Sequence, residues 1–242
     1  MVNNCINFVR SCLYPPTCIL CGDTAGFLPE YYRGHSVDLC GHCQSELPYN
    51  NHACIRCATP LTQSSATVCG ACQRKPPAFE RSLGLLRYLS PVDRLIHAFK
   101  FAGQLHIATV LGELMAGRIL DTNVPLPELL IPVPLHPIRL RERGFNQALE
   151  LARVISNKLT IPIDYRSCER SRMTVAQSLL PAKERHQNIK GAFTVHHPFK
   201  VKSVAIIDDV MTTGHTVNEL ASVLKDAGVD HVQVWAVARA NT

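Results

Sequence analysis

The sequence of 242 residues has no long hydrophobic run and few aromatic side chains. Its most apolar stretch, over 129–138, is interrupted by three prolines. No segment therefore reaches the roughly 18–20 apolar residues that a membrane helix needs. The N-terminal segment 1–16 also lacks the apolar core of an export signal. Aromatic residues make up only 6% of the chain, which favours contacts to phosphates over the reading of bases if the partner is a nucleic acid. We expect a globular, cytoplasmic protein that does not insert into membranes.

The positive charge of the sequence is concentrated in one segment. The formal net charge is +6, and the segment 139–190 has eleven basic against five acidic residues, an excess equal to that whole charge. Such an excess favours a phosphate-bearing partner, although a solvated helical surface has the same composition.

Cysteine, in contrast, is abundant, and eight of the eleven cysteines form four Cys-x-x-Cys pairs. A reducing compartment disfavours disulfides, whereas each pair can present two thiolates to a tetrahedral zinc ion. Four pairs make two sites, and the spacing allows a sequential or a cross-braced connection between the pairs. The resulting zinc ribbons either stabilise a segment too small to form its own core or contact nucleic acid or protein. His35, His42 and His52 are interpreted as surface residues. The predicted zinc ligands are Cys18, Cys21, Cys40, Cys43, Cys54, Cys57, Cys69 and Cys72.

The residue pattern changes at the Lys75-Pro76-Pro77 segment, from a cysteine-rich region with little hydrophobic periodicity to alternating apolar and amphipathic segments. This change predicts two domains, over 1–77 and 78–242. The first contains a short helix over 1–16 and the two zinc ribbons. The second alternates apolar strands with amphipathic helices, which is typical of an α/β, doubly wound parallel sheet. Strands are predicted over 81–89, 129–134, 163–168, 201–208 and 231–238, and helices over 93–120 with a break near Gly103, 144–158, 182–189 and 216–227.

One motif carries most of the chemical information. A buried strand over 204–207 is followed by Asp208 and Asp209, then by a loop of hydroxyl residues and glycine, then by a helix. The loop and the helix N-terminus supply backbone N–H groups to an anion, and Gly214 allows a close approach. Adjacent carboxylates can accept hydrogen bonds from the two hydroxyls of a sugar. The motif therefore indicates a ribose 5-phosphate site at the carboxyl end of a parallel sheet.

This motif resembles the phosphoribosyl pyrophosphate (PRPP) signature of type I phosphoribosyltransferases, and it matches that signature at every position. The segments 131–136 and 143–147, the series Gln177, Arg185, Asn188 and 191–193, and the four cysteine pairs further resemble the ComF family of competence and DNA-utilisation proteins. The resemblance covers about residues 15–240. It implies a double zinc-ribbon module followed by a type I phosphoribosyltransferase-like domain.

The resemblance also implies roles for individual residues. Asp208 and Asp209 would contact the ribose hydroxyls and act as the catalytic pair. A mobile loop over 170–177 would close over the ligand, and Mg²⁺ would accompany PRPP. The residues expected to bind the 5-phosphate or the pyrophosphate are Thr212, Thr213, Gly214, His215, Thr216, Arg139, Arg141 and Arg143.

The sequence is compatible with two functions. The protein could bind single-stranded DNA and a PRPP-type sugar phosphate while handling imported DNA, or it could be an active Mg²⁺-dependent phosphoribosyltransferase, for which the sequence shows no acceptor site. Arg141 and Arg143 fall at a predicted helix start, where the helix field repels them, and this position favours an anionic partner. A third hypothesis is that the ribbons dock the protein to a DNA-uptake or helicase complex. The aromatic side chains considered for base stacking are Tyr88, Phe145, Tyr165 and Phe193, of which Phe145 and Phe193 are more typical of core residues.

Overall fold

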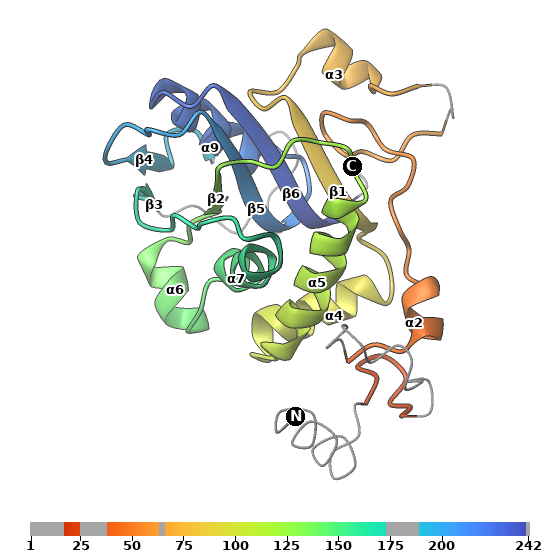
Figure 1. Ribbon diagram of the computed structural model, residues 1–242. Coiled ribbons are helices and arrows are strands. Elements are labelled where there is room, and N and C mark those ends of the chain that lie inside the picture. Colours follow the sequence, from red (N-terminus) through yellow and green to blue (C-terminus); the bar gives the residue numbers. More distant parts are fainter. Residues whose placement is uncertain (1–16, 25–37, 63–65, 173–188, 241–242) are drawn as a thin grey trace, which may run out of the picture. The chain divides into compact units, whose positions relative to one another are not determined.

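The computed structural model describes residues 17–24, 38–62, 66–172 and 189–240, which belong to two compact units, Met1–Leu47 and Pro48–Thr242 (Figure 1). The predicted helix over 1–16 and nearly all of the helix predicted over 182–189 lie outside the described residues. In the first unit, the described part of the chain contains the short helix α2 (Gly41–Ser45). None of the described helices has both the length and the apolarity needed to cross a bilayer.

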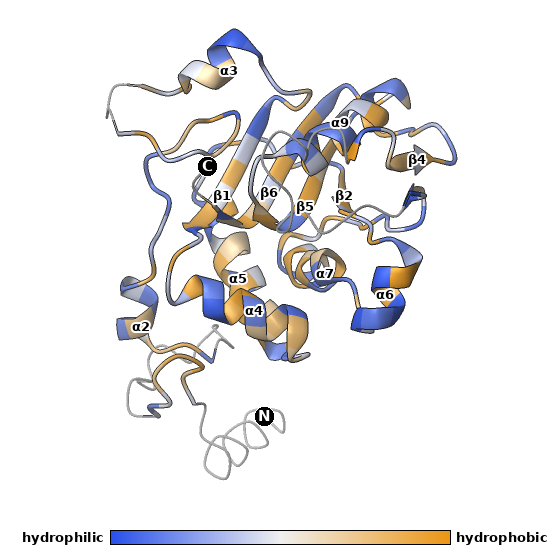
Figure 2. Cartoon of the chain, turned by 180° about the vertical axis from the view of Figure 1, so that it is seen from behind, coloured by the Kyte–Doolittle hydropathy of each residue, from blue (hydrophilic) through white to orange (hydrophobic). Residues whose placement is uncertain are grey.

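The second unit is built on a parallel sheet with the strand order β1-β6-β5-β2. The strands are β1 (Arg81–Arg87), β2 (Leu129–Pro132), β5 (Ser203–Met211) and β6 (His231–Arg239). In the register of the sheet, Ile206 of β5 is opposite Ile131 of β2 and Val234 of β6. Figure 2 shows hydrophobic residues along these strands. The predicted parallel α/β sheet is confirmed.

Helices cover both faces of this sheet because its strands are apolar on both sides (Figure 1). α9 (His215–Asp226) packs on one face, where Leu220 and Leu224 join Val204 and Ile206 of β5 in one core cluster. α5 (His106–Leu120) and α7 (Gln147–Leu159) lie together on the opposite face. α4 (Val92–Phe101) precedes α5, and the predicted break near Gly103 falls between them.

Several elements differ from the prediction. The strand expected over 163–168 is wrong: Ile163 makes a single parallel bridge to Leu130, and the next strand, β3 (Cys168–Arg170), pairs antiparallel with β4 (Phe193–Val195). The chain also forms a helix that was not predicted, α6 (Pro137–Arg143), before α7. Proline at the first helical position starts this helix, and Gly144, with φ of 82°, ends it.

The second zinc-ribbon segment, which includes α3 (Gly70–Arg74), lies along the free edge of β1. The backbone N–H of Asn50 donates to Leu85 O at 3.0 Å, and that of Ser82 donates to Ile55 O at 2.9 Å. Arg87 N–H donates to Pro48 O at 2.8 Å. These bonds satisfy edge groups of β1 that would otherwise be open to pairing with another chain.

Close packing between α5 and α7 generates a test of the fold. A Cβ atom on Gly112 of α5 would lie 2.7 Å from Cβ of Val154 on α7, whereas one on Gly117 of the same helix would have nothing within 4 Å. We expect Gly112→Ala to lower the free energy of unfolding by about 1–3 kcal/mol through overpacking. The control Gly117→Ala should raise that free energy by about 0.5–1 kcal/mol through helix propensity. Denaturant unfolding measures both, and equal effects of the two substitutions would contradict this packing.

Candidate functional site

The eight predicted zinc ligands form two groups of four, and within each group the sulfur atoms lie within 4.8 Å of one another. The first group combines the first two Cys-x-x-Cys pairs and the second group the last two, so the connection is sequential and the cross-braced alternative is wrong. The Sγ atoms of Cys21 and Cys40 are 3.8 Å apart, and those of Cys57 and Cys69 are 3.6 Å apart. A tetrahedral zinc ion with Zn–S bonds of about 2.3 Å requires about 3.8 Å between sulfurs, so both groups fit zinc.

Backbone groups support these two clusters. The N–H of Cys43 points to the Cys40 sulfur at 3.4 Å, and the N–H of Cys69 points to the Cys54 sulfur at 3.3 Å. Such contacts favour the thiolate form that binds metal. Among the described residues, His42 and His52 belong to neither group, and His35 lies outside the described residues.

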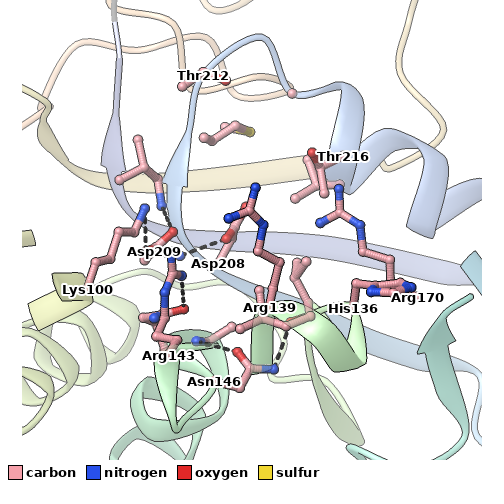
Figure 3. Close-up of a pocket in the computed structure, with 18 of the residues that line it drawn as sticks. Lys100, His136, Arg139, Arg143, Asn146, Arg170, Asp208, Asp209, Thr212 and Thr216 are labelled. Carbon is pink, nitrogen blue, oxygen red and sulfur yellow. Dashed lines mark hydrogen bonds and ion pairs between the residues drawn. The ribbon is translucent and has the colours of Figure 1, made fainter. Parts of the chain in front are cut away.

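A cavity of about 410 Å³ opens at the carboxyl ends of β2 and β5 (Figure 3). Asp208 and Asp209 line it from β5, which runs to Met211, so the strand extends past its predicted end at Asp208 and both carboxylates are part of it. After them in the chain come Thr212 and Gly214 of the loop and then the N-terminus of α9, the end of a helix at which backbone N–H groups point outward along the axis. The predicted juxtaposition of a carboxylate pair with a hydroxyl-rich loop is therefore present in the structure.

The five residues predicted to bind the 5-phosphate divide into two sets. Thr212, Gly214 and Thr216 line the cavity, while Thr213 and His215 are not among its lining residues. Gly214 has φ of 78°, a conformation that favours glycine, and it is the residue before the first turn of α9. This glycine turns the chain from the strand into the helix and keeps the loop close to the cavity.

Lys100 and Asp209 form an ion pair on one side of the cavity (Figure 3). The Lys100 Nζ at the end of α4 lies 2.7 Å from Asp209 Oδ2, and the other carboxylate oxygen of Asp209 accepts the Val210 N–H at 2.7 Å. Burial lowers the pKa of Lys100, but the charges of Asp209 and Asp208 outweigh it and raise that pKa above its ordinary value. Lys100 is therefore charged and compensates one of the two carboxylates.

Asp208 has a different electrostatic environment. Burial, followed by the neighbouring charge of Asp209, raises the pKa of Asp208 to about 8, against the smaller opposing effect of Lys100. Its Oδ1 accepts the backbone N–H of Asp209 at 2.9 Å. At neutral pH this carboxyl group is largely protonated in the free protein, and a cation in the cavity would favour its ionised form.

Arginines also line the cavity. Arg139 and Arg143 come from α6 and Arg170 from β3, whereas Arg141 is exposed and is not among the lining residues (Figure 3). Arg143 donates to Gln147 Oε1 at 2.7 Å, and Arg139 pairs with Glu142 at 3.1 Å. Burial is the main influence on the pKa of Arg143 and of Arg170, and it lowers both values. The charge of Asp209 opposes this shift at Arg143, and the charge of Asp208 opposes it at Arg170. The cavity thus contains both carboxylates and guanidinium groups, close enough for their charges to influence one another.

The placement of α6 corrects one argument from the sequence. Arg141 and Arg143 occupy the last turn of α6, where the helix field stabilises a cation, and α7 begins only at Gln147. The prediction that they sit against the field at a helix start is therefore wrong, because Gly144 ends one helix and Asn146 caps the next.

The Asn146 side chain connects α7 to the end of β2. It accepts the Ala148 N–H at 3.0 Å and donates to Val133 O at 3.0 Å.

The four aromatic residues considered for stacking have different environments, and the core placement expected of Phe193 is present. Phe193 is buried in the core, and Phe145 packs on the ring of Phe99 with centroids 5.6 Å apart. Tyr165 is exposed, and Tyr88 lines the cavity.

The sequence reading missed Phe101, which is 66% exposed and lines the rim of the cavity, with the Arg143 guanidinium 5.3 Å from its ring centroid. The sequence contained a weak signal, because Phe101 follows Lys100 at the end of the helix and falls outside the apolar stripe of Val92, Leu95, Ile96 and Phe99. Of the loop expected over 170–177, Arg170 belongs to β3 and residues 173–177 lie outside the described residues.

Fold and site together define a class of protein: an α/β domain of the phosphoribosyltransferase type that carries a double zinc ribbon. The family model of the double zinc ribbon domain matches residues 9–73, and that of the phosphoribosyl transferase domain matches residues 145–242.

The chain is 37% identical over 212 residues to Competence protein F of Haemophilus influenzae, a match that covers 85% of this chain and 86% of that protein. It is 36% identical over 205 residues to DNA utilization protein YhgH of Escherichia coli O157:H7, covering 83% and 90% of the two chains. Competence protein ComFC of Streptococcus pneumoniae is 24% identical over 230 residues, which cover 92% of this chain and 99% of that one. The chain belongs to the family of Competence protein F and YhgH, as the resemblance in its motifs predicted.

The raised pKa of Asp208 generates a test of the site. Between about pH 4 and pH 8 the folded protein retains a proton that the unfolded chain has released, so this group's contribution to stability falls as the pH rises through that window. We expect Asp208→Asn to be more stable than the wild type at pH 8 by on the order of 1–2 kcal/mol, and the difference to shrink toward pH 5. Denaturant unfolding at several pH values measures this, with Asp230→Asn, at an exposed carboxylate, as the matched control. A difference that does not vary with pH would contradict the electrostatic picture.

Proposed function

We propose that this protein handles imported DNA in the cytoplasm, and that it binds single-stranded DNA together with a PRPP-type sugar phosphate at the cavity beside β5. One observation carries the proposal: the carboxylate pair, the hydroxyl-rich loop and a wall of arginines all face one cavity. A ligand that matches these three surfaces has a diol, a terminal phosphate and further negative charge.

A ribose 5-phosphate with a pyrophosphate group has this chemistry. Its hydroxyls would contact Asp208 and Asp209, and its 5-phosphate would lie against Thr212 to Thr216 and the N-terminus of α9. Arg139 and Arg143 would hold the pyrophosphate. Mg²⁺ fits the same place, since carboxylate oxygens are its preferred protein ligands and, among the described residues, no cationic side chain is as close to Asp208 as Lys100 is to Asp209. When bound, the ion supplies charge neutralisation between the diol and the phosphates.

The names of the relatives, Competence protein F and DNA utilization protein YhgH, support DNA as a partner. Arg141 adds an exposed positive charge to α6, and exposed Phe101 offers a ring on which one base can stack at the rim. The phosphates would therefore follow α6, with a base near the sugar-phosphate site. Because these names connect the relatives with DNA, DNA-uptake machinery is a further candidate partner, which the ribbons would contact.

The presence of a carboxylate pair and of arginines in one cavity favours a second candidate, phosphoribosyl transfer from PRPP to a base. In that reaction the bond from the anomeric carbon to the pyrophosphate oxygen breaks and a bond to an acceptor nitrogen forms. Positive charge develops on the sugar ring beside Asp208 and Asp209, and the leaving pyrophosphate receives negative charge beside Arg139 and Arg143. Release of pyrophosphate on addition of bases or oligonucleotides would distinguish this candidate from binding alone.

Calorimetric titration with PRPP and Mg²⁺ tests the sugar-phosphate site. We expect the Asp208→Ala/Asp209→Ala double variant to lose binding, because both acceptors for the ribose hydroxyls are removed. Arg141→Ala is the control, and its Kd should stay within about two-fold of the wild type because this residue does not line the cavity. An unchanged Kd in the double variant would show that the carboxylates do not hold the ligand.

Salt dependence tests the path of single-stranded DNA. Replacing Arg139, Arg141 and Arg143 by Ala should reduce the slope of log K against log salt by about 0.7 for each phosphate that the protein no longer neutralises. Phe101→Ala should weaken binding about ten-fold at each salt concentration with the slope unchanged, because stacking involves no counterion release. If the triple variant keeps the wild-type slope, the DNA does not follow α6.

A further inference from the structure

Arg239 connects two sites that are far apart in the sequence. It is the last residue of β6, only 3% exposed, and its guanidinium group contacts both the second zinc ribbon and the end of β5. Toward the ribbon, Nε donates to the backbone oxygen of Cys57 at 2.9 Å and Nη2 donates to Thr59 Oγ1 at 2.8 Å.

The same guanidinium also holds the start of the loop in the cavity. Nη1 donates to the backbone oxygen of Met211 at 3.2 Å and to that of Thr212, the first residue after β5. A third carbonyl on this side, that of Ala240, accepts from the same nitrogen. Because the guanidinium is planar and rigid, these bonds fix the loop carbonyls relative to the ribbon carbonyl.

Thr59 extends this connection to a zinc ligand. Its hydroxyl oxygen lies 3.3 Å from the sulfur of Cys57, a member of the second four-cysteine group. With Cys57 in its metal-binding thiolate form, the hydroxyl donates to the sulfur and accepts from Arg239 at the same time. A continuous series of hydrogen bonds then runs from the sulfur through Thr59 and Arg239 to Thr212.

The residues around the base of the Arg239 side chain are tightly packed, and this packing holds the side chain in place. A Cβ atom on Gly84 of β1 would lie 3.1 Å from Cβ of Arg239 and 3.1 Å from Cβ of Ala58. The glycine therefore lets the ribbon, β1 and β6 approach one another at the point where the guanidinium emerges.

We infer that Arg239 and Thr59 are positioning residues through which the second zinc site holds the loop after β5 in its ligand-binding conformation. Metal occupancy in the ribbon then sets the order of that loop. The inference rests on the proposed function only in assigning sugar-phosphate binding to the loop. Arg239 and Thr59 themselves are not among the residues that line the cavity.

Hydrogen exchange measures the connection without any ligand. We expect Thr59→Val, with zinc loaded, to increase the exchange rate of the backbone amides of 212–216 about ten-fold, and Thr59→Ser to restore the wild-type rate. Thr122→Val is the matched control, because Thr122 is a half-buried threonine that bonds only within its own segment, to Ile119 O at 2.7 Å. Wild-type exchange in the Thr59→Val loop would overturn the inference.

Zinc content and the unfolding transition are measured on each sample. A Thr59→Val sample that has lost zinc still tests the inference, because its loop must then exchange faster than the zinc-loaded wild type, and slow exchange overturns it. Arg239→Lys provides a second variant that keeps the charge but cannot bridge ribbon and loop, and its loop should also exchange faster. Wild-type exchange in this folded variant would equally count against the inference.

PRPP titration then separates this inference from the proposed function. If the wild type binds PRPP with Mg²⁺, Thr59→Val should weaken the Kd about ten-fold while Thr59→Ser and Thr122→Val leave it unchanged. An unchanged Kd in Thr59→Val would overturn the positioning role. If the wild type binds no PRPP, the sugar-phosphate assignment fails, and the exchange rates alone decide whether the ribbon orders the loop.

Discussion

The parallel pairing of four strands is the constraint on which the candidate site depends. Parallel strands end at the same edge of a sheet, so the segments that follow β1, β2, β5 and β6 converge although they are far apart in the sequence. This edge receives Lys100 after β1, the arginines of α6 after β2, the carboxylates and loop of β5, and Arg239 at the end of β6. No single segment contains the site, and the pairing order of the strands assembles it.

Two adjacent carboxylates in one cavity repel each other, and the structure resolves this repulsion asymmetrically. Asp209 has a charged partner, Lys100, at 2.7 Å. Asp208 instead has a raised pKa, because burial and the charge of Asp209 both favour its protonated form. The pair is therefore poised to take up a cationic ligand group at Asp208 while Asp209 stays fixed. A ligand that delivers positive charge beside a diol gains the most from this arrangement.

The sequence was sufficient for the features that local chemistry determines. The run over 204–207 identified the central strand, its following residues identified the loop, and the Cys-x-x-Cys spacing identified the zinc ligands. It was insufficient where long-range packing decides: Pro137 and Gly144 delimit a short helix in a segment for which no element was predicted, and β3 forms only because β4 returns beside it. Phe101 and Arg239 were missed for the same reason, since exposure at a rim and burial between a ribbon and a loop are properties of the folded chain.

The hydrogen bonds between the ribbon segment and β1 also bear on how the chain folds during synthesis. β1 leaves the ribosome long before β6, its partner in the sheet, because about 150 residues separate Arg81 from His231. The segment from Pro48 to Ile55 is made just before β1, so it can occupy one edge of that strand as soon as it emerges. The nascent strand then has a single open edge while it waits for its C-terminal partner, which reduces its opportunity to pair with a strand of another nascent chain.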